Sequence, residues 1–369
     1  MKLAFPHMGN AYIPLRAVVN QLGIEAVVTE KPNRRTLQKG ALHSPEFVCL
    51  PFKVTLGDCM NALEKGADTL AMVCGMWACR FGYYGRVQHL ILRDIGYDFE
   101  SVLIGREEPG EIWRKLRPAI GKNVARKVAG ALALFRSKAS AVELVEALAR
   151  KTRPYEQERG STDGLLELYL HHLDKASSQR RVWELKREAR QAFGSLPMQD
   201  KNGTIRVRIV GELYVLLEPT LNLDLVRRLE SSLGVEAQPV LSTYRWLISP
   251  LWLDPSLHIY SSRARRLTRA YLPYVLGGEE HMTIAGVVSA REDGFDGVIH
   301  AYPLTCMPEN ICRTILPDIS SRTDLPLLSL CFDEHTSAAG LDARLEAFVD
   351  MLRARKEKRV LHGVIQASM

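Results

Sequence analysis

The chain has 369 residues, of which 46% are hydrophobic, and its formal net charge is +7 at pH 7. This length allows two or three globular domains of about 150 residues each. No apolar run approaches the roughly 20 residues of a membrane span. The opening MKLAFPHMGN lacks the continuous hydrophobic region of a signal peptide, so we expect a cytoplasmic protein without a membrane segment.

The segment 1–105 alternates between strand and helix patterns. The expected strands are MKLAF, EAVVTE, ADTLAMVCG and SVLIG, and the expected helices between them are AYIPLRAVVNQLG, VTLGDCMNALEKG and YYGRVQHLILRDIG. Alternation of this kind predicts a parallel sheet that helices cover on both faces.

From 112 to 193 the strand patterns disappear, and apolar residues recur at three- and four-residue steps, as in KVAGALALFRSK and AVELVEALARK, which predicts helices. The alternation resumes with TIRVRIVG and continues through LNLDLVRRLESSLG, EAQPVLS, FDGVIHAYP, PENICRTILPDI, PLLSLCF and LDARLEAFVDMLRARKEKR. We therefore predict an α/β fold with an N-terminal α/β domain at 1–111, a helical insertion at 112–200 and a C-terminal α/β domain at 201–369.

Much of the positive charge lies in the middle segment, in WRKLRPAIGKNVARKVAGALALFRSK and SSQRRVWELKREARQ. Two interpretations stay open: solvated helix faces, or a docking surface for an acidic partner or for the phosphates of a nucleotide-like substrate. No zinc-finger or RNA-binding signature accompanies the charge, so we do not expect a nucleic-acid partner.

Cysteine is the residue type that points to chemistry. The chain contains Cys49, Cys59, Cys74, Cys79, Cys306, Cys312 and Cys331. In a reducing compartment each is a small buried hydrophobe, a catalytic thiol or a metal ligand. Cys49, Cys79 and Cys306 each precede an expected helix at the end of an extended segment. Ligands of open parallel sheets bind beyond the carboxyl ends of the strands, so we predict that these three thiols converge there.

The thiols suit a metal cluster better than a single zinc ion. A helix N-terminus carries partial positive charge and free N–H groups, which stabilise a thiolate or an anionic cluster. The chain lacks the paired C-x2-C spacing typical of zinc sites, whereas iron–sulfur clusters accept thiolates from distant loops. Three protein thiolates would leave one iron open to an external ligand. Cys59, Cys312 and Cys331 are expected to be core residues. For Cys74, a core position and a role as a metal ligand both stay possible interpretations.

Four segments carry a family resemblance: SPEFVCLPFKVTLGD, ACRFGYYGRVQ, GVIHAYPLTCMPE and LSLCFDEHTSAAGLDARLEAFVDML. They resemble the iron–sulfur component of the 2-hydroxyacyl-CoA dehydratase and benzoyl-CoA reductase group, and more closely the acyl-CoA dehydratase activase-related proteins, also labelled CoA protein activase. The chain departs from this pattern where Met76, Trp77 and Ala78 precede Cys79, in place of the usual glycine and proline. Trp77 either shields a cluster or is a core aromatic.

The resemblance implies two Rossmann-like halves with a cysteine-bound iron–sulfur cluster between them. Its ligands would be Cys49 in VCLPFK, Cys79 in ACRFG and Cys306 in TCMPE, with Cys74 a weaker candidate. The cluster would be a [4Fe–4S] cubane or, as in a cousin group, a double cubane that needs about six thiolates.

A separate ATP-hydrolysing activase of the actin and Hsp70 type would supply a low-potential electron for radical dehydration or reduction of a CoA thioester or another small substrate. The chain has no GxxxxGK[ST] motif, so it is not expected to be the ATPase. A homodimer or heterodimer is implied. A cluster-carrying scaffold without catalysis and a metal-free α/β binding protein are the alternatives.

Polar residues beside these motifs have two interpretations each. Arg80 and Lys53 either balance the charge of a cluster or bind a substrate carboxylate, or they form surface salt bridges. Glu334 and His335 follow a predicted strand and are candidates for proton transfer, or they cap the following helix. Glu309 is expected to be a first-turn carboxylate that the helix dipole favours.

Overall fold

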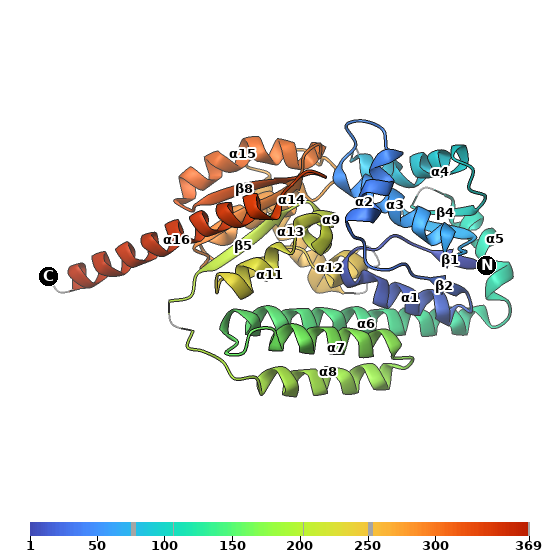
Figure 1. Cartoon of the computed structure of the whole chain (residues 1–369), viewed down its shortest axis with the longest axis horizontal. Coiled ribbons are helices and arrows are strands. Elements are labelled where there is room, and N and C mark those ends of the chain that lie inside the picture. The colour runs from blue at the N-terminus through green and yellow to red at the C-terminus, as the bar shows by residue number, and fades with distance from the viewer. Residues whose placement is uncertain (75–78, 106, 202, 250–253, 368–369) are drawn as a thin grey trace.

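The computed structural model describes the chain except residues 75–78, 106, 202, 250–253 and 368–369, with side chains as far as Arg359. The described residues form two separate four-stranded sheets, and every strand pairs in parallel with its neighbours (Figure 1). The α/β fold with two Rossmann-like parallel sheets, predicted from the alternation of strands and helices, is confirmed.

The first sheet comes from the N-terminal part of the chain. Its elements are β1 (Lys2–Ala4), α1 (Tyr12–Gln21), β2 (Glu25–Val27), α2 (Arg34–Leu42), α3 (Leu50–Glu64), β3 (Thr69–Val73), α4 (Tyr84–Asp94), β4 (Glu100–Ile104) and α5 (Pro109–Ile120). Its strand order is β2-β1-β3-β4. The chain leaves β1 toward one edge and returns to β3 on the other side, so the loops after β1 and β3 flank the position where ligands of such sheets bind.

The second sheet repeats this topology in the C-terminal part. Its elements are β5 (Arg206–Gly211), α9 (Leu213–Leu217), α10 (Pro219–Asn222), α11 (Leu225–Arg227), β6 (Glu236–Pro239), α12 (Thr243–Ile248), α13 (Pro255–Thr268), α14 (Glu280–Ala290), β7 (Gly297–Pro303), α15 (Met307–Thr323), β8 (Leu327–Phe332) and α16 (Ala338–Ala367). The order β6-β5-β7-β8 makes β5, β6, β7 and β8 the counterparts of β1, β2, β3 and β4.

The single helix expected over residues 221–234 is wrong. Two short helices, α10 and α11, and a π-helical turn at Arg228–Ser232 occupy this segment. The break falls at Leu223 and Asp224, which have φ angles of 55° and 58°. The Asn222 side chain stabilises it, because its amide donates to Val215 O at 2.6 Å and its carbonyl oxygen accepts from Leu225 N at 3.1 Å.

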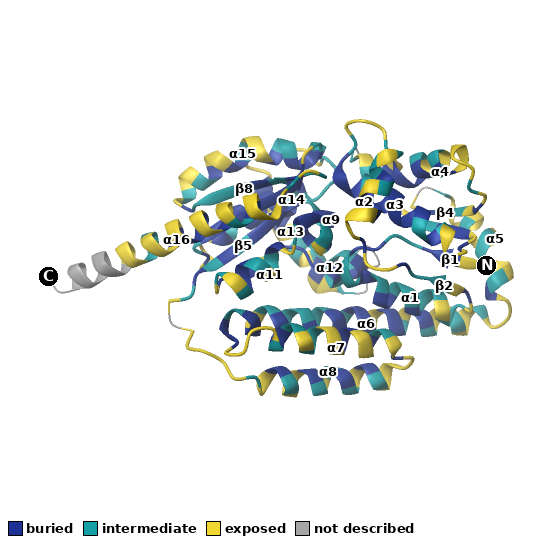
Figure 2. Ribbon diagram, viewed as in Figure 1, coloured by how far each residue is buried: buried dark blue, intermediate teal, exposed yellow. Residues whose placement is uncertain are grey.

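Helices α6 (Val124–Thr152), α7 (Ser161–Lys175) and α8 (Gln179–Gly194) form a layer beneath both halves (Figure 1). Figure 2 shows buried residues along all three helices, and the core that they share includes Ile13 and Ala17 of α1. Helix α6 contacts both α1 and α12, so it spans the two halves. The expected boundary after residue 111 falls inside α5, whose Ile120 packs with Leu3 and Ile24 of the first half. Among the described residues, no helix is long and apolar enough to cross a membrane.

The carboxyl edges of the two sheets face each other. Gly9 N, after β1, donates to Glu218 Oε2 at 2.8 Å, and Thr220 Oγ1 donates to Pro32 O at 2.6 Å. A Cβ atom on Gly9 would lie 2.2 Å from Leu217 O, and its φ of +51° also favours glycine. The apolar side chains Met8, Leu37, Leu50 and Val54 extend the core of the second sheet. Loops that follow strands of both sheets therefore meet at one interface.

A buried ion pair joins α6 to the second half, and we expect its loss to destabilise the protein. Arg153 pairs with Glu230 and, at 2.8 Å, with Asp163. Burial alone lowers the pKa of Arg153, but these carboxylates outweigh it and raise the pKa, so the guanidinium stays charged. Arg153→Met leaves the buried Glu230 without its ion-pair partner, whereas Asp163 keeps Arg227 at 2.7 Å, and breaking such a buried pair costs about 3–5 kcal/mol. The measurement is the midpoint of chemical denaturation.

The matched control is Arg180→Met, because Arg180 is exposed on α8 and pairs with Glu184 at 3.1 Å. Its loss should change stability by less than about 1 kcal/mol. Equal midpoints for the two variants would show that the buried pair contributes no more than a surface pair.

Candidate metal centre

Three cysteines occupy the N-cap position of a helix. Cys49 precedes α3, Cys306 precedes α15, and Cys79 precedes the 3-10 turn Arg80–Tyr83 that leads into α4. Cys79 and Cys306 follow β3 and β7, which are counterparts in the two sheets. The predicted position of these cysteines at the starts of helices is confirmed, and all three lie on the edges where the sheets face each other.

Arg80 ties the three cysteine-bearing loops together. Its Nη1 donates to Phe47 O at 2.8 Å, and its Nη2 donates to Thr305 O. Phe47 lies two residues before Cys49, Thr305 directly precedes Cys306, and Arg80 itself follows Cys79. One guanidinium therefore fixes the spacing of the three loops, a role in which backbone carbonyls satisfy its donors.

The three thiols and Glu212 lie close enough to affect one another's charge. Burial raises the pKa of Cys49 to about 12, and it also raises the pKa of Cys79 and Cys306. The charge of Glu212 raises the pKa of each thiol further, and Cys49 interacts with both other cysteines. The N–H groups of Phe81 and Glu309 lower the pKa of Cys79 and Cys306, as expected at helix N-termini, but burial outweighs them and the net pKa of both thiols is raised.

The thiol of Cys49 has an aromatic neighbour that the sequence does not single out. Cys49 Sγ and Tyr84 Oη form a hydrogen bond. The Tyr84 ring packs against Phe52 and Phe81 with centroid distances of 5.0 and 5.1 Å. Burial beside these rings raises the pKa of Cys49, whereas the hydrogen bond with Tyr84 lowers it by a smaller amount.

Two of the other four cysteines lie in the core of the N-terminal half. Cys59 lies within α3 on its buried face, and burial raises its pKa. Cys74 is 5% exposed in the same core, where a Cβ atom on Gly85 would approach its Sγ to 2.9 Å. The structure thus places Cys74, which the sequence left open, among apolar side chains of the N-terminal half.

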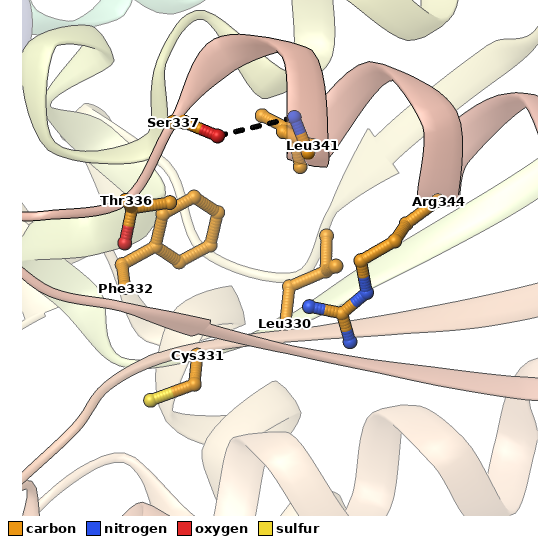
Figure 3. A pocket seen from close by; sticks show the side chains of 8 residues that line it. Leu330, Cys331, Phe332, Thr336, Ser337, Leu341 and Arg344 are labelled. Atoms are coloured by element: carbon orange, nitrogen blue, oxygen red, sulfur yellow. Dashed lines mark hydrogen bonds between the residues drawn. The ribbon is translucent and has the colours of Figure 1, made fainter.

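The remaining two cysteines lie in the C-terminal half. Cys312 is fully buried in α15. Cys331 is half-buried on β8 and borders a cavity of about 210 Å³ between β8 and α16. Figure 3 shows its thiol on the side of β8 opposite to Leu330 and Phe332, as strand alternation requires.

Glu212 and Glu279 are acidic groups of the site that the sequence interpretation missed. Glu212 directly follows β5 and caps α9, where its carboxylate accepts from Val215 N at 2.9 Å. Gly211 allows this turn, because its φ is +139° and a Cβ atom would lie 1.8 Å from Ala301 O. Burial raises the pKa of Glu212 to about 7, and burial with neighbouring glutamates raises that of Glu279 to about 7. Such carboxyl groups can exchange protons near neutral pH.

Glu309 has more than a helix-dipole role. Its Oε2 lies 2.9 Å from His300 Nε2, and its Oε1 accepts from Thr283 Oγ1 at 3.0 Å. All three side chains are buried, and His300 stacks on Tyr302 at 4.6 Å. This network joins β7, α14 and α15, and it holds the first turn of the helix that Cys306 begins.

Lys53 forms a salt bridge, which was one of its two interpretations, and its partner is Glu334. Lys53 Nζ lies 2.5 Å from Glu334 Oε1 across the interface between the halves. His335 is exposed, its backbone N–H donates to Asp333 Oδ1 at 2.9 Å, and no contact described in the structure links it to the cysteines. Proton transfer by Glu334 and His335 is therefore not supported, and Glu212 and Glu279 take their place as candidates. Trp77 lies outside the described residues.

Within the described part of the chain, no three His, Cys, Asp or Glu side chains are grouped so that they could hold a single metal ion. A cubane of iron and sulfide is larger than an ion and spaces its thiolates more widely, and its usual protein ligands are thiolates.

The chain matches no model of a known protein family, and it has no significant sequence match among curated proteins.

Thiol reactivity in the metal-free protein tests these assignments. A thiolate is the reactive species, so alkylation follows exposure and a low pKa. With iodoacetamide at pH 8, we expect the half-buried Cys79 and Cys331 to be modified first, as measured by peptide mass spectrometry. The slower group comprises Cys49, Cys59, Cys306 and Cys312.

Denatured protein is the control, in which all seven cysteines should react at similar rates. Modification of Cys49 or Cys306 as fast as Cys331 in the native protein would contradict the burial and high pKa described for them.

The Lys53–Glu334 salt bridge should stabilise the interface between the two α/β halves in a pH-dependent way. Burial alone raises the pKa of Glu334, but the hydrogen bond and charge of Lys53 outweigh it and lower the pKa. The salt bridge therefore stabilises the folded protein fully above about pH 6, and this stabilisation is lost as the pH falls below about 4. A double-mutant cycle of Lys53→Met and Glu334→Gln should give a coupling energy of about 0.5–1 kcal/mol at pH 7.

The matched control is the cycle for Lys2 and Glu25, which are 3.8 Å apart and more than half exposed. It should give a coupling energy near zero. A coupling between Lys53 and Glu334 that is as large at pH 3 as at pH 7 would rule out the ionised pair.

Proposed function

We propose that this chain is an iron–sulfur protein in which Cys49, Cys79 and Cys306 hold a [4Fe–4S] cluster between the two α/β halves. The observation that carries the proposal is the convergence of three thiols. They come from three separate helix N-termini at the facing sheet edges, share the influence of Glu212, and belong to loops that Arg80 joins.

The surroundings of the thiols support an anionic cluster. Backbone N–H groups of Phe81 and Glu309 favour negative charge on Cys79 and Cys306. The high pKa values mean that the thiols bind as thiolates only when iron displaces their protons, so cluster assembly releases protons and is favoured by higher pH. When bound, such a cluster supplies one-electron chemistry and, with three thiolates, one iron open to a substrate.

A single cubane agrees better with the arrangement of cysteines than a double cubane does. A double cubane needs about six thiolates. Cys59 and Cys312 lie inside α3 and α15, well past the helix N-termini that carry Cys49 and Cys306, which leaves five of the seven cysteines for a cluster.

The electron donor and the substrate follow from the family resemblance. We propose that an ATP-hydrolysing activase reduces the cluster and that the reaction is dehydration or reduction of a CoA thioester or another small molecule. Glu212, whose charge raises the pKa of all three thiols, supplies an acid–base group beside them, and Glu279 interacts with Glu212. The protein is proposed to act in the cytoplasm as a homodimer or heterodimer.

The first experiment measures iron and acid-labile sulfide on protein purified and reconstituted without oxygen, together with its electron paramagnetic resonance spectrum. We expect about four irons and four sulfides per chain. The variants Cys49→Ser, Cys79→Ser and Cys306→Ser should each lose most of this iron, because a hydroxyl is a far weaker ligand than a thiolate for iron in a cluster.

The matched control is Cys331→Ser, which removes a half-buried thiol from β8 and should leave the iron content unchanged. Iron-free protein after reconstitution, or full iron content in all three ligand variants, would overturn the proposal. A reduced-cluster signal that appears only with activase and ATP, followed by no turnover of any thioester, would favour the scaffold alternative.

A further inference from the structure

A second cavity lies away from the cysteines, between one face of β5 and β6 and helices α13 and α14. Its volume is about 360 Å³. Four arginines line it: Arg206, Arg208, Arg245 and Arg263. The lining contains one carboxylate, that of Asp293. The cavity is therefore rich in positive charge.

The positive charge is only partly neutralised by the protein. Asp293 pairs with Arg208 at 2.9 Å, and Arg206 pairs at 3.1 Å with Glu236, which is not part of the cavity wall. Arg245 donates to Val240 O at 2.7 Å. Burial and the charge of Arg206 lower the pKa of Arg208 despite Asp293. Two guanidinium groups, Arg245 and Arg263, thus have no carboxylate partner among the described residues.

Aromatic rings hold three of the guanidinium groups in place. Arg245 lies over Tyr260 with its guanidinium carbon 3.9 Å from the ring centroid, and Arg208 and Arg206 lie over Phe295 at 4.1 and 4.7 Å. Phe295 is 5% exposed, so its ring is fixed by the core. Stacking of this kind restricts the guanidinium groups before any ligand arrives and reduces the entropy lost on binding.

We propose that this cavity binds a small phosphorylated molecule. Guanidinium groups match phosphate oxygens with two parallel hydrogen bonds, and a phosphate dianion neutralises more charge than a carboxylate does. The volume is at the lower end of the usual range for ligand pockets, about 300–1,000 Å³, which suits a compact ligand. The site does not depend on a cluster, because its arginines lie on the face of β5 and on α12 and α13 rather than at the cysteine-bearing edge.

Titration calorimetry on the full chain tests the site with pyrophosphate, inorganic phosphate and citrate at constant ionic strength. We expect saturable binding of pyrophosphate, with weaker binding of phosphate and citrate. Arg245→Ala and Arg263→Ala should each weaken pyrophosphate binding about tenfold, because each removes a charge-assisted hydrogen-bond donor. The matched control is Arg266→Ala, an exposed arginine of the same helix as Arg263 that does not line the cavity.

Circular dichroism shows whether each variant is folded. If Arg245→Ala is unfolded, the test relies on Arg263→Ala. Arg263 is exposed, and its removal breaks no contact described in the structure. No saturable binding, or an equal loss of affinity in Arg263→Ala and Arg266→Ala, would overturn the proposal. Tighter binding of citrate than of pyrophosphate would overturn the assignment to a phosphorylated ligand.

Discussion

The hydrogen bonds of Arg80 set the spacing of the three cysteine-bearing loops. They join segments 33 and 225 residues away along the chain, and these segments belong to two different sheets. Each hydrogen bond contributes only about 1 kcal/mol, and Arg80 is exposed, so it cannot hold the halves together alone. The larger contribution comes from Met8, Leu50 and Val54, which are buried in the core of the second sheet. Apolar packing therefore closes the interface, and Arg80 fixes the spacing of the loops within it.

Burial raises the pKa of the cysteine thiols and the helix N-termini lower it, and the effect of burial is the larger of the two. A helix N-terminus stabilises a nearby negative charge by about 0.3–1 kcal/mol. The rise in the pKa of Cys49 from 9.0 to about 12 corresponds to about 4 kcal/mol against the thiolate. Burial therefore dominates, and the free protein holds neutral thiols. The positively charged core of iron and sulfide in a cluster would reverse this balance, whereas a catalytic thiol would need the low pKa that these residues lack.

Alternating hydrophobic patterns were enough to predict both sheets and the places of Cys49, Cys79 and Cys306, because these features depend on local sequence. Glu212 directly follows the expected strand TIRVRIVG, so the same rule about strand ends could have found it. The other features depend on distant contacts. Glu334 pairs with Lys53 across 281 positions, and no local pattern shows that partner. The expected helix over 221–234 failed because the Asn222 side chain bonds to the backbone, which hydrophobic spacing does not report.

The repeated topology relates the acidic and sulfur groups of the site. Helix α3 precedes β3 and begins after Cys49, and helix α14 precedes β7 and begins after Glu279. Glu279 thus stands where Cys49 stands in the other half, while Cys79 and Cys306 are counterparts of each other. Two equivalent halves could have supplied four thiols, but one place holds a carboxyl group whose pKa is about 7. This one departure from symmetry therefore places a proton-exchanging carboxyl group, instead of a fourth thiol, at this position.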